Sequence, residues 1–273
     1  MHFWLQRFAR PKHKAKVDAD FEETLAGQAS TPLPLVEAME DVRAKLPGAD
    51  NFGQTGDERD LYTLIDRVAQ GVTSGMPQSL CHKGCDACCH YPVGLFVISY
   101  SEWRLIVRHM ETVWDEAERA EFVSRYRAVF TPFWRAVVGF LQDSWFTMLL
   151  TAPILLRQRI ACPFLKNGQC SVYAARPYQC RTFGAFTART WPFKEPRVYA
   201  CNAQGQLLHQ AQTEGVFGVQ LPVMNLFVKR IRAMCRGPRL SLPMWALMWV
   251  RRYERRQAQR DASRDNDAAT STR

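Results

Sequence analysis

Four cysteines crowd into one short segment of the sequence. In the run Cys-His-Lys-Gly-Cys-Asp-Ala-Cys-Cys they are separated by three residues, then two, then none, and they are Cys81, Cys85, Cys88 and Cys89. Thiolate sulfur is a soft ligand that selects zinc, copper(I) or iron–sulfur clusters. Buried structural cysteines have no physical reason to gather in a glycine-containing segment. The spacing therefore predicts a metal centre on reduced thiolates, which we expect to be iron–sulfur by preference, or zinc.

The adjacent pair Cys88 and Cys89 carries further information. Side chains of neighbouring residues diverge, so two adjacent cysteines are poorly placed to chelate one ion as a pair. In bacterial ferredoxins, one cysteine of a tight run ligates a second cluster. We therefore expect Cys88 and Cys89 to serve two centres or to hold different atoms of one multinuclear cluster.

A second set of cysteines follows much later in the chain. It occurs in the runs Cys-Pro-Phe-Leu, Cys-Ser-Val-Tyr, Arg-Pro-Tyr-Gln-Cys-Arg-Thr-Phe and Cys-Asn. Together with the first group, these motifs resemble the YkgJ-type cysteine-cluster family, which is described as zinc- or iron-chelating, and the resemblance covers about residues 81–202. It implies a ligand set whose sulfurs converge in one region: Cys81, Cys85, Cys88, Cys89, Cys162, Cys170, Cys180 and Cys201.

Several other residues near this set could take part in the site. His82 and His90 could ligate metal, but cysteines alone complete a four-coordinate site, so we expect both histidines to face solvent. Arg176 and Arg181 flank one cysteine of the second set, where they could offset thiolate charge or shape the turn. Cys235 lies outside the motifs beside an apolar helical stripe, and we expect it to be a core residue.

The elements that must position these cysteines are predicted to be mainly helical. The expected fold class is mainly α (α+β), a helical domain with one small β-hairpin organised around the cysteine cluster. Ser99 and Glu102 form a capping-box pattern that opens one helix, and Pro132 restarts another. Apolar residues at helical spacing predict helices near 61–68, 103–110, 122–130, 133–141 and 223–234, and from about 241.

The predicted hairpin spans about residues 160–173, because two short apolar runs flank Asn167-Gly168. With a two-residue turn there, Leu165 faces Cys170 and Cys162 faces Tyr173. In that register Cys162 and Cys170 point to opposite faces unless a bulge shifts the pairing.

The chain divides by composition into three parts. We expect a basic N-terminal extension and linker over 1–56, the cysteine-cluster domain over 57–235, and a C-terminal helix over 236–273 whose polar tail is disordered from about Gln257. The net charge is +10, and much of it lies near the two ends. Without a nucleic-acid-binding signature, a solvated basic surface is the simpler interpretation, and nucleic acid is not an expected partner.

The sequence shows neither a secretory leader nor an apolar run of the length that spans a membrane. The cytoplasm is then the expected compartment, where thiols stay reduced.

The physiological role is open at this stage. A structural, stored or sensing metal is one reading. The motifs also resemble flagellin lysine methylases, which implies a protein methyltransferase that uses an iron–sulfur cluster with S-adenosylmethionine, although the usual Gly-x-Gly-x2-Gly loop is absent. The spacing C-x3-C-x2-C also matches radical S-adenosylmethionine enzymes, but Ala87 stands where an aromatic residue is usual. A basic zinc protein that binds nucleic acid is the fourth reading.

Overall fold

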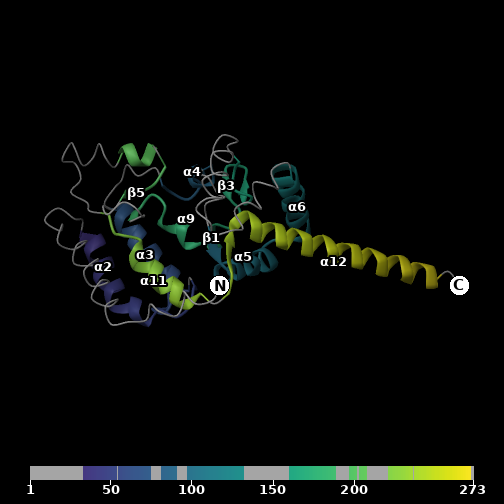
Figure 1. The fold of residues 1–273 in the computed structure, drawn as a ribbon, viewed down its shortest axis with the longest axis horizontal. Coiled ribbons are helices and arrows are strands. Elements are labelled where there is room, and N and C mark those ends of the chain that lie inside the picture. Colours follow the sequence, from purple (N-terminus) through teal and green to yellow (C-terminus); the bar gives the residue numbers. More distant parts are fainter. Residues whose placement is uncertain are drawn as a thin grey trace, which may run out of the picture. The chain divides into compact units, whose positions relative to one another are not determined.

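The structure is a computed structural model, and it describes residues 33–53, 55–74, 81–90, 97–131, 160–188, 197–201, 203–207, 221–235 and 237–271. These residues are mainly helical and contain small antiparallel strand pairs, which confirms the predicted fold class (Figure 1). The chain forms two compact units. Unit 1 contains Met1–Cys88 and Arg176–Arg236, and unit 2 contains Cys89–Ala175 and Gly237–Arg273.

Unit 1 is built on the predicted amphipathic helix α3 (Leu61–Ser74). Its apolar stripe at Leu61, Leu64, Ile65 and Val68 is at most 1% exposed, as expected from the helical spacing. Against this core lie the elements α2 (Leu33–Lys45), η2 (Leu46–Gly48), α9 (Tyr178–Thr182) and α11 (Asn225–Met234).

Residues 33–49 correct part of the expected organisation. We expected 1–56 to be a peripheral extension and linker, yet α2 packs on α3 and buries Leu35, Met39 and Val42. The helix does end before Pro47-Gly48, where η2 follows.

A strand pair in unit 1 brings distant residues together. Strand β4 (Phe186–Ala188) pairs antiparallel with β5 (Arg197–Tyr199), with Phe186 opposite Tyr199. Just before β4, the Gly184 N–H donates to the Tyr199 carbonyl at 2.7 Å, outside the register of the strand pair. This bond places Gly184 beside the end of β5, two residues before Cys201.

Unit 2 is organised by another antiparallel pair, β1 (Val97–Ser99) with β6 (Arg239–Ser241). Each strand leads directly into a helix. Because the strands are antiparallel, α5 (Tyr100–Thr112) and α12 (Leu242–Ser271) begin at opposite ends of this short pair. The Trp245 indole N–H donates to the Ile98 carbonyl at 3.2 Å and ties α12 to β1. Helix α6 (Glu116–Phe130) packs along α12 (Figure 1).

Aromatic residues fill the core of unit 2. Phe122 of α6 stacks on Phe164, with ring centroids 5.1 Å apart, and Trp114 and Trp249 contact the Phe122 ring. The predicted stripe of α6 is buried at Phe122, Tyr126 and Phe130. The helix predicted over 133–141 lies outside the described residues.

The predicted hairpin is present but shorter than expected. Strand β2 (Leu165–Lys166) pairs with β3 (Gln169–Cys170), and Asn167 and Gly168 take positive φ values of 50° and 73°, as a two-residue turn requires. Cys162 does not face Tyr173. Its carbonyl instead accepts from the Leu165 N–H at 3.0 Å and closes a turn, while Tyr173 begins the 3-10 helix η5 (Tyr173–Ala175). Because Cys162 is not part of the hairpin ladder, the register does not require Cys162 and Cys170 to point to opposite faces.

Helix α12 begins where predicted but continues to Ser271, past the expected start of disorder at Gln257 (Figure 1). Its middle is tied to α6, because Tyr253 donates to Glu116 at 2.6 Å and Arg127 pairs with Glu254. Beyond Gln257, helix-favouring alanine, arginine and glutamine extend an exposed helix without an apolar face. Polarity alone therefore predicted disorder wrongly.

The capping box of α5 gives a stability prediction. The Ser99 hydroxyl donates to Glu102 Oε2 at 3.0 Å and accepts from the Glu102 N–H at 3.2 Å, and both residues are buried. We expect Ser99→Ala to lower the free energy of unfolding by about 1–2 kcal/mol in urea titrations, because a buried cap is lost. Ser263→Ala, on the exposed part of α12, is the control and should change it by less than about 0.5 kcal/mol. Equal effects of the two variants would contradict the importance of this cap.

Candidate metal centre

The sulfur of Cys81 occupies a recess made by a glycine. A Cβ atom at residue 184 would lie 2.9 Å from the Cys81 Cβ and closer still to its sulfur. Gly184 also has a φ of +88°, a conformation that favours glycine. The absence of a side chain at residue 184 therefore makes room for this thiol.

Cys201 lies near the same glycine, because it follows Tyr199, whose carbonyl accepts from the Gly184 N–H, by two residues. A turn fixes its position, because the Gly205 N–H donates to the Cys201 carbonyl at 2.8 Å and the Gln204 N–H lies 3.5 Å from the Cys201 sulfur. The fully buried Gln204 side chain donates to the Gly184 carbonyl at 3.4 Å. Cys81 and Cys201 are thus held around one glycine.

Cys85 and Cys88 approach Cys81 from its own segment. The Cys85 N–H donates to the His82 carbonyl at 3.0 Å, in a turn that contains Gly84 at φ +100°. The one-turn helix α4 (Ala87–His90) follows and carries the adjacent pair Cys88 and Cys89. Successive residues on a helix diverge by about 100°, which agrees with the expected divergence of this pair.

The thiols interact electrostatically. Burial, together with the negative charges of Cys85, Cys201 and Cys88, raises the pKa of Cys81 to about 12, while Arg176 acts in the opposite direction. Cys85, Cys88 and Cys201 of unit 1 are therefore close enough for their charges to act on Cys81, and we call these four residues the thiol group. A bound cation would remove the mutual repulsion that opposes their ionisation.

A buried ion pair supports the segment that carries Arg176. The Arg181 guanidinium, whose side chain is 1% exposed, donates to Asp66 of α3 at 2.6 Å and to the Arg176 carbonyl at 2.8 Å. It also lies 4.3 Å from the centre of the Tyr62 ring. The two arginines therefore divide the expected roles, because Arg181 fixes the turn and Arg176 supplies positive charge near Cys81.

Three other cysteines of the expected set lie in unit 2. The Cys162 N–H donates to the Cys89 carbonyl at 2.7 Å, and Cys170 ends strand β3 of the hairpin. Desolvation lowers the pKa of Arg125, and the charges of Glu121 and Cys162 oppose that shift. The boundary between the units falls between Cys88 and Cys89.

The remaining candidates lie as follows. His82 and His90 are exposed, as expected of solvent-facing residues. Cys180 lies on α9 of unit 1, where its N–H donates to the Pro177 carbonyl at 3.0 Å. Cys235 is half-buried at the end of α11, so it is a capping residue rather than a fully buried core residue. Within the described ranges, no three Cys, His, Asp or Glu side chains already stand in a geometry that could hold a metal ion.

The segment that contains the eight expected cysteine ligands matches a known protein family. Residues 80–202 match the model of the CxxCxxCC family, described as "Putative zinc- or iron-chelating domain". This segment matches the model of a cysteine-cluster family, and residues 80–202 are called the cysteine-cluster domain from here on. The family description supports metal binding by the cysteine-cluster domain, and the match contains all eight cysteines expected as ligands. Comparisons of the chain with curated proteins and with solved structures give no match.

Sequence reasoning missed three residues that shape the thiol group. Gly184, Gln204 and Asp66 belong to no cysteine motif. Asp66 precedes the first motif, Gly184 lies between two motifs, and Gln204 follows the last one. Only Gly184 had a usable signal, because a glycine shortly after the Arg-Pro-x2-Cys-Arg-x-Phe run suggests close approach of another group. As for the membrane, no helix within the part of the chain that the structure describes is both long and apolar enough to cross one.

Gly184→Ala tests the recess. The new Cβ must displace the Cys81 sulfur and also occupies a strained positive φ, so we expect bound metal per chain to fall at least about tenfold. Gly168→Ala is the matched control, since it has a φ of +73° and nothing within 4 Å of its Cβ position. That control should retain metal within about twofold of the unaltered protein. Similar losses in both variants would show that backbone strain, rather than the recess, is responsible.

The proton on Cys81 predicts a pH dependence of the metal-free protein. Its thiol has an ordinary pKa of 9.0 and a folded pKa of about 12, so unfolding releases a proton between these values. The contribution of this thiol to stability is fully present below pH 9 and is lost as the pH rises towards about 12. The free energy of unfolding, measured in urea, should fall more steeply across this window than in Cys81→Ser. Parallel slopes for the two proteins would contradict the raised pKa.

Proposed function

We propose that the cysteine-cluster domain holds an iron–sulfur cluster, or alternatively zinc, with Cys81, Cys85, Cys88 and Cys201 as its central ligands. The observation that carries this proposal is the recess at Gly184, which holds the Cys81 sulfur, a group on which the charges of three other cysteines act. The other four cysteines of the family motif, Cys89, Cys162, Cys170 and Cys180, complete the proposed ligand set.

The chemistry of the donor set fits such a group. Four thiolates satisfy the tetrahedral preference of zinc and of each iron in a cluster. Half-buried thiols that repel one another gain little from proximity unless a cation stabilises their ionised forms. The Arg176 charge near Cys81 would offset part of the negative charge that four thiolates give to the centre.

The adjacent pair Cys88 and Cys89 favours iron–sulfur over a single zinc ion. Their side chains diverge on α4, and a multinuclear cluster offers separate iron atoms to diverging sulfurs. When bound, such a cluster would supply one-electron chemistry, and the chain's own residues would set its potential through burial and the nearby guanidinium. Reduced thiols of this kind suit the cytoplasm, which we propose as the compartment.

A protein methyltransferase that uses S-adenosylmethionine remains the alternative function. It rests on the resemblance to flagellin lysine methylases and requires an S-adenosylmethionine site in addition to the cluster. Titration of the metal-loaded protein with S-adenosylmethionine tests it, because a metal-holding protein without this activity gives no binding heat.

Metal and sulfide analysis after anaerobic purification tests the proposal itself. We expect iron with acid-labile sulfide, and zinc alone would instead support a structural zinc site. Cys81→Ser and Cys201→Ser should each lower bound metal to less than about a tenth, because each removes a central ligand. Cys235→Ala is the matched control, since it removes a half-buried thiol outside the motifs and should leave metal content unchanged. Loss of metal from the Cys235 variant alone would show that the ligand set is misassigned.

A further inference from the structure

Unit 2 contains a groove that is separate from every cysteine of the proposed set. It has a volume of about 570 Å³ and is lined by residues of α5, α12 and the first turn of α6. This volume lies within the range of about 300–1,000 Å³ that small-molecule sites occupy. The short β1–β6 pair and the contact between Trp103 of α5 and Trp245 of α12 hold the two helices together along the groove.

One end of the groove is aromatic. The indole rings of Trp103 and Trp245 stack at 6.0 Å between centroids with an interplanar angle of 12°, and Tyr100 lies 5.6 Å from Trp245. These indoles are buried and form the floor, whereas Tyr100 is 43% exposed and Met248 is 50% exposed. Flat apolar surface is therefore available to an aromatic ligand at the start of both helices.

The rest of the groove is strongly cationic. Its lining contains six arginines and two glutamates, a net charge of +4. Arg104 and Arg108 lie one turn apart on α5, and Arg252 and Arg256 lie one turn apart on α12. None of these four guanidinium groups has a hydrogen bond or ion pair with another described residue. Guanidinium groups are well suited to bind phosphate oxygens in a bidentate manner.

The two glutamates differ in their availability. Glu116 is engaged by Arg119 at 3.0 Å and by the Tyr253 hydroxyl at 2.6 Å, so it fixes α6 to α12. The exposed carboxylate of Glu111 has no hydrogen-bond partner among the residues that the structure describes. An acceptor of this kind suits a hydroxyl or amino donor on the ligand.

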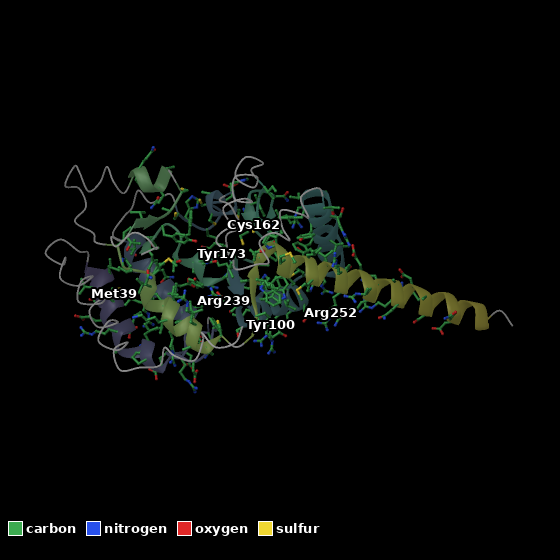
Figure 2. All side chains as sticks on the ribbon, viewed as in Figure 1. Met39, Tyr100, Cys162, Tyr173, Arg239 and Arg252 are labelled. Atoms are coloured by element: carbon green, nitrogen blue, oxygen red, sulfur yellow. The ribbon has the colours of Figure 1, made fainter. Side chains whose placement is uncertain are left out.

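We propose that this groove binds a nucleotide, with the base against Tyr100 and Met248 and the phosphates on the arginines of α5 and α12. Figure 2 labels Tyr100 on α5 and Arg252 on α12, which represent the two halves of the site. A base needs a flat apolar surface and phosphates need several guanidinium groups, and a single cavity here offers both. This inference does not depend on the proposed metal centre.

The arrangement favours a free nucleotide over a nucleic-acid strand. A strand would track a basic groove across many phosphates and would stack successive bases on several exposed rings. Here the tryptophans are buried in the floor, and Tyr100 is the well-exposed ring at the aromatic end. One exposed ring can stack with one base, so a single nucleotide fits this groove better than a strand does.

Calorimetric titration of the full-length protein with ATP at about 0.15 M salt tests the proposal. We expect saturable binding that quenches tryptophan fluorescence, because Trp103, Trp245 and Trp249 line the groove. Arg252→Ala with Arg256→Ala should weaken binding at least about tenfold. Arg251→Ala with Arg255→Ala is the matched control on the same helix, lies outside this groove and should change affinity less than about twofold. Metal content and helical circular dichroism should be the same in both double variants.

The individual parts of the ligand provide the decisive comparisons. Tyr100→Ala should weaken ATP binding about fivefold or more while leaving the binding of inorganic tripolyphosphate unchanged. Equal affinity for tripolyphosphate and ATP would overturn the proposal, because the groove would then be a simple anion site. S-adenosylmethionine that binds as tightly as ATP would also overturn it, since this compound has the base without phosphates. Tighter binding of a ten-residue oligothymidylate than of ATP at the same salt would overturn it in favour of single-stranded nucleic acid.

Discussion

The crowding of thiols around Cys81 is the constraint on which the cysteine-cluster domain depends. Burial and the charges of three other cysteines hold its pKa near 12, so the group is electrostatically unfavourable once ionised. Gly184 provides the space for the Cys81 sulfur because it has no side chain, and the positive charge of Arg176 partly offsets the repulsion between the thiolates. A bound metal turns the same crowding into a source of stability, which is how metal binding and folding become coupled.

The support for this arrangement comes from an ordinary amphipathic helix. The apolar face of α3 builds the core of unit 1, and its edge carries Asp66, which binds the buried Arg181 guanidinium at 2.6 Å. Arg181 in turn donates to the Arg176 carbonyl at 2.8 Å and thereby restrains the turn before α9. An ion pair this well buried is costly to break, because either partner alone would leave an uncompensated charge. Core packing is thus linked to charge placement at the thiols.

Local chemistry was predictable from the sequence wherever one short segment decided the outcome. The Ser99–Glu102 capping box, the Asn167-Gly168 turn and the buried stripe of α3 all formed as predicted, because each depends on neighbouring residues. Two features were not predictable. The recess at Gly184 depends on contacts with the distant residues Cys81 and Tyr199, and the helical end of α12 depends on helix propensity that its polarity concealed. The cysteine motifs identified the chemistry of the site but contained no information on its packing partners.

The grouping of basic residues on one face was also not predicted from the sequence. A net charge of +10 suggested a solvated surface, because a count of charges does not say which of them share a face. The residues that line the groove on α12 recur at helical spacing from Trp245 to Arg260, so the aromatic and basic positions form one continuous face. That face lines a groove with α5 because the β1–β6 pair and the Trp103–Trp245 stack hold the two helices together, and β6 is too short to be recognised from sequence. Contacts between segments far apart in the sequence, such as the hydrogen bond between Trp245 and Ile98, which are 147 residues apart, therefore gather these arginines around one groove.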